Sequence, residues 1–580
     1  MNALAAEKTI SFDTETSGLL ETDRPFALAL ATSNAQFYLD RRVLTDPYFK
    51  HVISLLEEKD KDLIGQNIKF DLRMMHAQWG FTPKGCLKDT EILGRLVKND
   101  HLSYGLDAQA KRYGMEKSKE VEEYITKHKL YTQTQSKYKT KKVKRLHFDE
   151  VPMDIMGRYA LQDARITYDL HEKLIMDLDP ISYPIWTMEQ ALTPICFQME
   201  RTGIKVDVPY TERALCYEES LIREAKSQFL LATGKQYDNS KALLVEVFIA
   251  AGEVIKKTDK GNDQLTDDDL EKFTSPAAKI VQKIRFHEKR VSTYYSSFME
   301  LKDDQDIIHP DMRQAGTTTG RFSYREPNLQ NVPKEDGSKD AFVVRGCFRP
   351  REGNIFVSMD FKQQEYRLML SYANHRKLIC EVMDGADVHQ ATADLVGVSR
   401  NVAKTLNFAI LYGAGADKLS GMLGISKSES SELRNRYFNS IIEVEDLIFN
   451  ITKKGQGRGY VYNWLGRKLN RTIVSTSKGT VDFAYKLPNH LIQGGGADIC
   501  KTAMVRCAEI LQGYDTKMML QIHDAIVFEG PKKELEELAP GLKKAMIESW
   551  PIKNGMAMDI DIAWSDKSLA ERDMKPWDQK

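Results

Sequence analysis

Short apolar runs predict strands at three places in the chain, and each place also carries an aspartate. In residues 9–16, TISFDTET, apolar and polar residues alternate, which predicts a strand that carries Asp13. The apolar run 355–357 predicts a buried strand that delivers Asp360 at its end. Far downstream, MMLQIHDAIVFEG predicts two apolar strands joined by a hairpin tip at Asp524. Two strand ends that each present an aspartate can meet over a sheet, so we expect Asp360 and Asp524 to lie together and share metal ions.

The other main pattern is helical, and it organises residues 400–413, RNVAKTLNFAILYG. Arg400, Lys404, Phe408 and Tyr412 follow one another at four-residue steps, which places them on one face of a helix. Two cations suit a polyphosphate and two rings can stack on a base, so this face matches both ends of a nucleoside triphosphate. Taken alone, the stripe is more typical of an amphipathic helix with solvated charges and buried rings, and only the other motifs favour the nucleotide-binding interpretation.

Composition narrows the class of protein. A chain of 580 residues exceeds the size of a single core, so we expect several domains. The 83 basic and 83 acidic residues cancel, so a nucleic-acid-binding surface must come from local segregation of charge. The seven cysteines show no CxxC spacing, which favours free thiols. Because the sequence has no run of 18 apolar residues and no signal-peptide pattern, we expect a cytoplasmic location, which includes the cytoplasm of an infected cell, and no membrane association.

Acidic residues stand out in three segments of the first 178 positions. Asp13 and Glu15 are two apart on the predicted strand, so they share a face and repel each other unless a cation lies between them. Asp71 in GQNIKFDLRMM lies where a loop is expected to become a helix. Tyr159 and Asp163 in YALQD share one face of a predicted helix. Each pattern is common by chance, and solvated surface acids are the alternative to a metal site.

A basic stretch interrupts this part of the chain, because six of the nine residues 137–145 are Lys or Arg. One interpretation is a mobile, solvated loop. The other is an arm that contacts phosphates of single-stranded DNA, since such contacts need only flexible cations. In the second case, neutralising Lys139, Lys141, Lys142 and Lys144 weakens DNA binding and flattens its salt dependence.

Taken together and in order, these segments resemble two known sets of motifs. The three acidic segments are similar to the exonuclease motifs of proofreading 3′→5′ exonucleases, and residues 354–370, 400–413 and 518–530 look like motifs A, B and C of the DNA polymerase I family, family A. The resemblance implies a multidomain α/β fold, with an RNase H-like exonuclease domain followed by a right-hand polymerase domain. The implied domains are 1–178 (exonuclease), 179–310 (thumb and connecting helices), 311–378 and 499–580 (palm) and 379–498 (fingers).

The resemblance also assigns roles to individual residues. In the exonuclease, Asp13, Glu15, Asp71 and Asp163 would hold two Mg²⁺ ions, for which Mn²⁺ can substitute, and Tyr159 would orient the attacking water. In the polymerase, Asp360, Asp524 and the carbonyl of Phe361 would hold two more. The implied nucleotide contacts are Gln363, Glu365, His389, Arg400, Lys404, Phe408 and Tyr412, with Lys404 also catalytic and Glu365 a steric gate against a ribose 2′-hydroxyl. The implied DNA contacts are Arg321, Asn328, Gln330, Asn331, Asn489, Gln493 and His523.

Three features depart from the family pattern. Ala525 follows the motif C aspartate where many relatives have a second acid, so we expect altered metal affinity with activity retained. Lys362 follows motif A, where it could contact phosphate or point to solvent. Finally, only 12 residues precede Asp13, so we expect no 5′ nuclease domain and a layout like that of a phage replicative enzyme.

The sequence thus predicts a template-directed DNA polymerase with proofreading, acting as a monomer on primer–template DNA and dNTPs. A helicase, primase or single-strand binding protein would be a further partner. One alternative is a single-subunit RNA polymerase, against which the exonuclease motifs and Glu365 argue. The other is a catalytically silent DNA-binding or scaffold protein, to which only Ala525 points.

Overall fold

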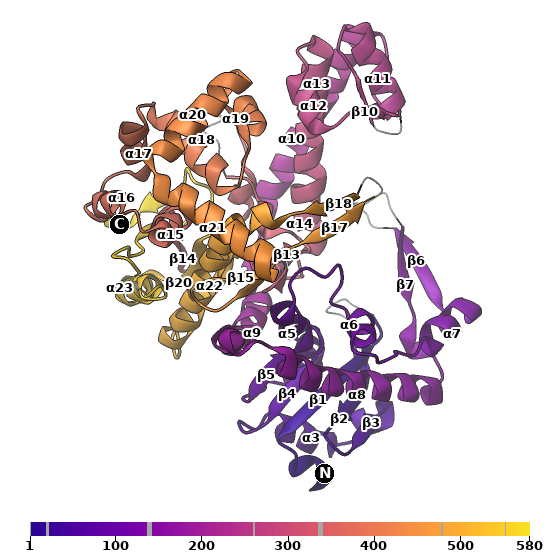
Figure 1. The fold of residues 1–580 in the computed structure, drawn as a ribbon. Coiled ribbons are helices and arrows are strands. Elements are labelled where there is room, and N and C mark those ends of the chain that lie inside the picture. The colour runs from indigo at the N-terminus through magenta and orange to yellow at the C-terminus, as the bar shows by residue number, and fades with distance from the viewer. Residues whose placement is uncertain are drawn as a thin grey trace.

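The computed structural model describes residues 2–18, 23–135, 142–258, 261–334, 340–476, 479–551 and 553–579. Figure 1 shows two sheet-containing parts at the two ends of the chain, with a group of helices projecting between them. None of the helices within the described residues combines the length and apolar character that crossing a bilayer requires.

The N-terminal part is built on a five-stranded sheet of order β3-β2-β1-β4-β5. Its strands are β1 (Thr9–Thr16), β2 (Pro25–Ala31), β3 (Gln36–Leu39), β4 (Asp62–Gly65) and β5 (Cys86–Asp89). β1 is antiparallel to β2 and parallel to β4, so the chain enters the sheet through hairpins and then crosses over to its parallel edge. The 25-residue helix α8 (Met153–Asp177) packs on β1 and β2 and brings Asp163 to the central strand.

Helices dominate the middle of the chain. α9 (Tyr183–Thr202) ends at Gly203, whose φ of 57° is a backbone conformation that favours glycine. The projecting group in Figure 1 contains α10 (Val208–Thr233), α11 (Lys241–Ala250), α12 (Asp267–Lys272) and α13 (Pro276–Lys289), with α14 (Ser296–Leu301) at its base. Thr266 is the N-cap of α12, where it forms a reciprocal capping box with Asp269.

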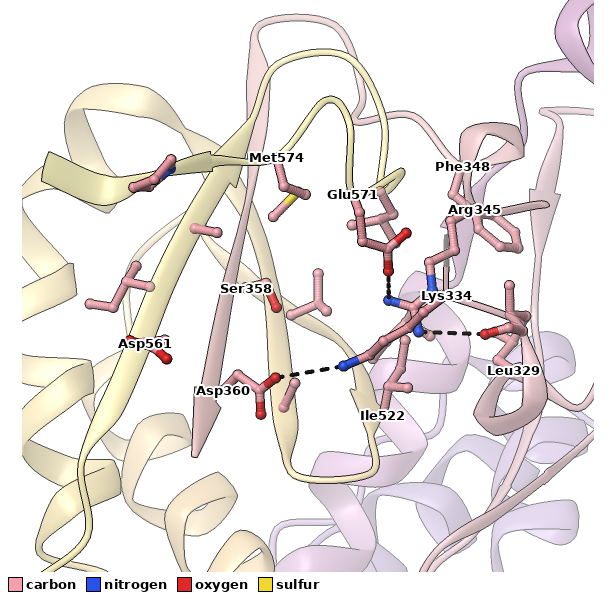
Figure 2. Close-up of a pocket in the computed structure, with 18 residues that line it drawn as sticks. Leu329, Lys334, Arg345, Phe348, Ser358, Asp360, Ile522, Asp561, Glu571 and Met574 are labelled. Carbon is pink, nitrogen blue, oxygen red and sulfur yellow. Dashed lines mark hydrogen bonds and ion pairs between the residues drawn. The ribbon is translucent and has the colours of Figure 1, made fainter. Parts of the chain in front are cut away.

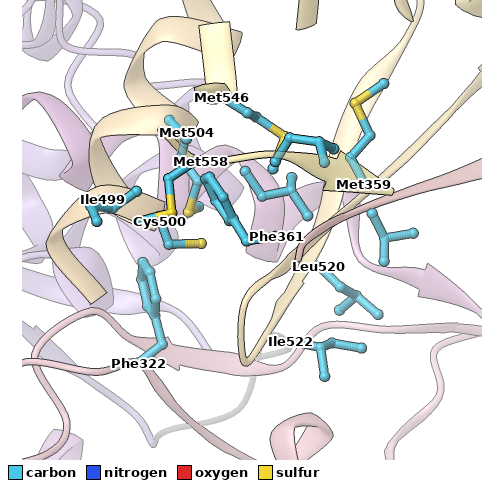
Figure 3. Close-up of a cluster of buried hydrophobic side chains, with 14 of the residues drawn as sticks. Phe322, Met359, Phe361, Ile499, Cys500, Met504, Leu520, Ile522, Met546 and Met558 are labelled. Atoms are coloured by element: carbon cyan, nitrogen blue, oxygen red, sulfur yellow. The ribbon is translucent and has the colours of Figure 1, made fainter. Parts of the chain in front are cut away.

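The C-terminal part has an antiparallel sheet of order β19-β20-β14-β21-β22. The strands are β14 (Asn354–Phe361), β19 (Lys517–Ile522), β20 (Ala525–Pro531), β21 (Ile560–Ser565) and β22 (Lys575–Pro576). Along β14, Met359 and Phe361 point into a core with side chains of α22 (Leu487–Ile510) and α23 (Lys532–Ile547), as Figure 3 shows. The intervening Ser358 and Asp360 therefore face the opposite side of the sheet.

A run of seven helices follows β14 in the chain and extends away from this sheet (Figure 1). They are α15 (Gln364–Ala373), α16 (Arg376–Met383), α17 (Val388–Val396), α18 (Arg400–Leu411), α19 (Ala416–Leu423), α20 (Lys427–Ser440) and α21 (Ile442–Arg458). The helix predicted over 400–413 is confirmed, but it ends two residues earlier. Tyr412 is its C-cap, and Gly413 has a φ of 67°, which terminates the helical path.

The flanks of the basic stretch form a hairpin, which the loop interpretation did not foresee. β6 (Tyr131–Gln135) pairs antiparallel with β7 (Lys142–Leu146). Lys144 lies over the Tyr131 ring, and Arg145 pairs with Asp23. Lys139 and Lys141 lie outside the described residues.

Candidate active sites

The N-terminal site begins with β1, which carries Asp13 and Glu15 two residues apart. Thr14 between them holds Asp71 of α4 (Lys69–Trp79): its backbone nitrogen and its hydroxyl donate to Asp71 Oδ1 at 2.9 and 2.6 Å. Thr14 therefore holds Asp71 next to the two strand carboxylates.

Helix α8 supplies the last acid. Ser11 Oγ of β1 donates to the carbonyl of Ala164 at 2.7 Å, which ties α8 to the strand beside Asp163. Tyr159 lies one turn before Asp163, and both are buried. Lys117, on the loop between α6 (Leu106–Arg112) and α7 (Glu120–His128), places its Nζ 2.6 Å from Asp163 Oδ2.

The electrostatics of this group are those of a site built for cations. Burial, together with the neighbouring carboxylates, raises the pKa of Glu15 to about 8 and that of Asp13 well above its usual range. Burial also raises the pKa of Asp71 to about 6, although its bonds to Thr14 oppose the shift. Among the described residues, Glu15 Oε1 and Asp163 Oδ1 are buried oxygens without a hydrogen-bond partner. Unpartnered, repelling carboxylate oxygens are what hard divalent ions bind, so the donor set fits Mg²⁺ or Mn²⁺.

The four carboxylates do not close into a tight cage by themselves. Within the described ranges, no three carboxyl, imidazole or thiol groups converge closely enough to form a preformed metal site. Like charges keep such groups apart, and the Lys117 ammonium lies against Asp163 where one of the cations would bind.

The C-terminal site brings Asp360 and Asp524 together, as the strand pattern predicts. Asp524 lies in the two-residue turn between β19 and β20, where His523 has a φ of 57°. Its carbonyl accepts from Phe361 N at 3.2 Å, which joins the turn to the end of β14. Burial, followed by the charge of Asp524, raises the pKa of Asp360 to about 7. Asp360 Oδ1 is another buried oxygen without a partner among the described residues, so this pair also fits a cation.

The two sequence departures lie directly beside Asp360. In the sheet register, Asp360 faces Ala525 on β20 and Asp561 on β21, so one cross-strand neighbour lacks a carboxylate and the other has one. Lys362 Nζ pairs with Asp559 and Asp561 at 2.9 and 3.0 Å, so its ammonium lies at the edge of β21 and does not point freely to solvent. Figure 2 shows Asp561 on the strand next to Asp360, with Lys334 approaching Asp360 from the other side at 3.9 Å.

A cavity of about 370 Å³ lies between α18, α15 and the β19–β20 turn. Residues with predicted nucleotide or DNA roles that line it are Arg321, Gln363, Glu365, His389, Phe408, Tyr412, His523 and Asp524. The rings of Phe408 and Tyr412 are nearly parallel, at 12°, with centroids 6.4 Å apart, and both are partly exposed. Glu365 is held from two sides, because Tyr412 Oη donates to it at 2.9 Å and Arg321 forms an ion pair with it.

The two cations of the helical stripe lie outside this cavity lining. Arg400 and Lys404 are exposed on α18, on the same helix as the two rings. Arg400 Nη2 binds Asp387 Oδ2, the N-cap of α17, at 2.8 Å. His389 of α17 meets Asn407 at 3.1 Å, and burial lowers its pKa, with Arg400 and Lys404 adding to the effect.

The predicted DNA contacts divide into two groups. Asn328, Gln330 and Asn331 line a second cavity of about 270 Å³, together with Arg321 and His523. The Gln330 amide, however, is used inside the protein, since it donates to Gln521 and accepts from His523 N, each at 2.8 Å. Asn489 and Gln493 lie one turn apart on α22, and the Asn489 oxygen has no partner within the described residues.

Sequence reasoning missed Lys117 and Gln521. Lys117 lies in a polar stretch between helices, where one lysine among many carries no signal. Gln521 is the polar exception in an otherwise apolar strand, and that contrast in MMLQIHD could have marked it. In the structure its amide bonds His523 and Gln330.

The fold and the two sites define a class before any relative is considered. A mixed sheet bearing a buried cluster of carboxylates precedes an antiparallel sheet whose hairpin sets two aspartates beside a cavity lined by aromatic rings and polar groups. Nucleic-acid polymerases with an attached nuclease domain combine these features.

Comparison with known proteins gives the family. Residues 207–568 match the sequence model of DNA polymerase family A, and residues 1–179 match that of a 3′-5′ exonuclease. The chain therefore belongs to DNA polymerase family A and carries a 3′-5′ exonuclease domain. The predicted family and fold class, an RNase H-like domain followed by a right-hand polymerase domain, are confirmed.

Individual relatives agree with this assignment. DNA polymerase I of Synechocystis sp. is 31% identical over 85% of this chain and 52% of its own length, so the chain spans about half of that relative. DNA polymerase DpoZ of Acinetobacter phage SH-Ab 15497 is 27% identical over 91% of this chain and 92% of its own length. A solved structure of the polymerase domain of Pol1 from M. smegmatis, in complex with DNA primer-template and dNTP, matches with a TM-score of 0.82, 22% identity and 98% and 97% coverage of the two chains. At that identity, the likeness concerns the fold alone.

Proposed function

We propose that the protein is a template-directed DNA polymerase that extends a primer 3′-hydroxyl with dNTPs and proofreads with a 3′→5′ exonuclease. The observation that carries the proposal is the pairing of Asp360 and Asp524 at the β19–β20 turn, next to the cavity lined by Glu365, Phe408 and Tyr412. A phage-type replicative role is part of the proposal, supported by the phage relative that this chain nearly spans. The domain boundaries given above are proposed with it.

In the polymerase site, Asp360, Asp524 and the Phe361 carbonyl would hold two Mg²⁺ ions, with Mn²⁺ as a substitute. Bound there, the ions would lower the pKa of the primer hydroxyl and neutralise the leaving pyrophosphate. Arg400, Lys404 and His389 would bind the triphosphate, and the Phe408 and Tyr412 rings would stack near the incoming and template bases. Glu365, with Gln363 beside it, would exclude the ribose 2′-hydroxyl.

In the exonuclease site, Asp13, Glu15, Asp71 and Asp163 would hold two further ions, and Tyr159 would orient the water that attacks the terminal phosphodiester. Arg321, Asn328, Asn331, Asn489, Gln493 and His523 would contact the minor groove of the primer–template, because amide and cationic donors can bond acceptors that all base pairs share. Gln330 would act indirectly, through the turn that carries His523. A helicase, primase or single-strand binding protein, a monomeric state and a cytoplasmic location stay predictions.

A primer-extension assay tests the proposal. The full chain is given a labelled primer–template, Mg²⁺ and either dNTPs or rNTPs, with EDTA as the control. We expect extension with dNTPs and, when nucleotides are omitted, stepwise shortening of the primer. A preference for rNTPs would favour the single-subunit RNA polymerase. The absence of any reaction would favour the catalytically silent DNA-binding or scaffold protein.

A further inference from the structure

The exonuclease site contains a cation that neither the motifs nor the proposed mechanism uses. Lys117 Nζ lies 2.6 Å from Asp163 Oδ2 and 4.7 Å from the centroid of the Tyr159 ring. Its side chain is only 18% exposed. A lysine is almost never buried unless it is paired, so the contact with Asp163 is what allows this position. Burial raises the pKa of Asp13, Glu15 and Asp163, and the charge of Lys117 opposes that rise at all three, so it acts on the site and not on one partner alone.

The loop that carries Lys117 is clamped from both sides. Gln162, the residue before Asp163 on α8, accepts from Ser118 N at 2.8 Å and donates to the Glu116 carbonyl at 3.0 Å. One amide thus bonds the backbone on either side of Lys117. The next turn is also fixed, because Arg158 of α8 binds Glu120 of α7 at 2.6 Å. Such anchoring sets the place of the lysine relative to Asp163 and reduces the entropy lost in holding it there.

The charge of Lys117 affects the stability and the geometry of the carboxylate group. The four carboxylates repel one another, and three of them are buried, where a charge without a partner is costly. A fixed ammonium at Asp163 offsets part of that repulsion, holds the carboxylate in one orientation, and keeps the neighbouring tyrosine ring packed against it. The same ammonium competes with any cation that approaches Asp163, so it should weaken metal binding slightly while improving the geometry of the loaded site.

We propose that Lys117 is a positioning residue of the exonuclease site, which orients Asp163 and Tyr159 and supplies a fixed positive charge among the four carboxylates. The proposal rests on the proposed exonuclease function. The proposal includes Gln162, because Lys117 can orient Asp163 only if the loop that carries it is held against α8.

The test compares Lys117→Met with Lys117→Arg, and uses Lys119→Gln as the matched control, since Lys119 is an exposed lysine two residues away. Exonuclease kcat and KM are measured on single-stranded DNA with Mg²⁺, and primer extension by the same preparations reports on folding. Mn²⁺ binding is measured by electron paramagnetic resonance in chains that also carry Asp360→Asn, so that Mn²⁺ bound at the polymerase site contributes less to the signal.

We expect Lys117→Met to lower kcat at least about tenfold, with KM within about twofold, equal or tighter Mn²⁺ binding, and unchanged primer extension. Lys117→Arg should recover part of kcat, Gln162→Leu should lower it less than Lys117→Met, and Lys119→Gln should match the wild type. Wild-type exonuclease rates in Lys117→Met would overturn the proposal. So would weaker Mn²⁺ binding with a parallel loss of primer extension, which would indicate a merely structural lysine. A wild-type chain that degrades no DNA would instead overturn the proposed exonuclease function on which this inference rests.

Discussion

Among single residues, Glu365 is held by two contacts in the lining of the cavity beside α18. Tyr412 donates to one carboxylate oxygen and Arg321 pairs with the other. These bonds fix the side chain in one position, as its proposed role of excluding a hydroxyl by bulk requires.

Replacing Glu365 by Ala should raise ribonucleotide insertion relative to deoxyribonucleotide insertion by at least about tenfold, or ~1.4 kcal/mol of lost discrimination. The reason is that the space now filled by the carboxylate would admit a 2′-hydroxyl. Single-nucleotide insertion kinetics with paired dNTP and rNTP check this. Glu365→Gln, which keeps the size of the side chain, should stay selective, and equal selectivity in the Ala and wild-type enzymes would remove Glu365 from the gate.

Gln330 gives a second prediction at this scale. Its amide satisfies His523 N and Gln521, so Gln330→Leu leaves buried polar groups unpaired next to Asp524. We expect a loss of about 1–3 kcal/mol in stability and slower primer extension, with exonuclease activity retained. Thermal unfolding and both activity assays measure this, and Gln512→Leu, the same change at an exposed position that has no proposed role, is the control. If Gln330→Leu behaves like that control, the internal bonds do not support the turn.

At the scale of elements, a fully buried ion network joins three distant segments. Glu189 of α9 and Asp498 of α22 both bind Arg467, which lies between β15 (Tyr460–Tyr462) and β16 (Lys468–Asn470), and Lys501 of α22 also binds Glu189. The two acidic and two basic side chains have formal charges that cancel, and none of the four is more than 4% exposed. The network therefore fixes α22, which carries Asn489 and Gln493, against α9.

Arg467→Met should destabilise the protein by about 3–5 kcal/mol, because it leaves two buried carboxylates with too little positive charge. Denaturant unfolding measures the change. Arg471→Ala removes a more exposed pair with Asp482 and should cost no more than about 1 kcal/mol. Equal costs for the two variants would mean that burial of the network contributes nothing.

Elements also explain what the sequence could and could not predict. The strand that ends at Asp360, the turn at Asp524, and the stripe on α18 follow from periodicity, because side-chain direction is set by local geometry. The pairing of Lys362 with Asp561, the place of Lys117 against Asp163, and the Gln330–Gln521 bond join residues far apart in the chain. Those contacts depend on how sheets and helices pack, and no local pattern contains that information.

At the scale of the whole molecule, two acidic sites lie on two different sheets, and each is assembled from segments of its own part of the chain. Asp13, Glu15, Asp71 and Asp163 share no described hydrogen bond or ion pair with Asp360 or Asp524. We therefore expect synthesis and proofreading to be separate chemistries at two independent sites.

The most direct test is a reciprocal pair of variants, Asp360→Asn and the double substitution Asp13→Asn with Glu15→Gln, each assayed for primer extension and for degradation of single-stranded DNA with Mg²⁺. Asp360→Asn should lose extension by more than about a hundredfold while degrading DNA at the wild-type rate, and the double variant should do the reverse. If either variant lost both activities while remaining folded, or neither variant lost any, the existence of two independent metal-dependent sites would be contradicted.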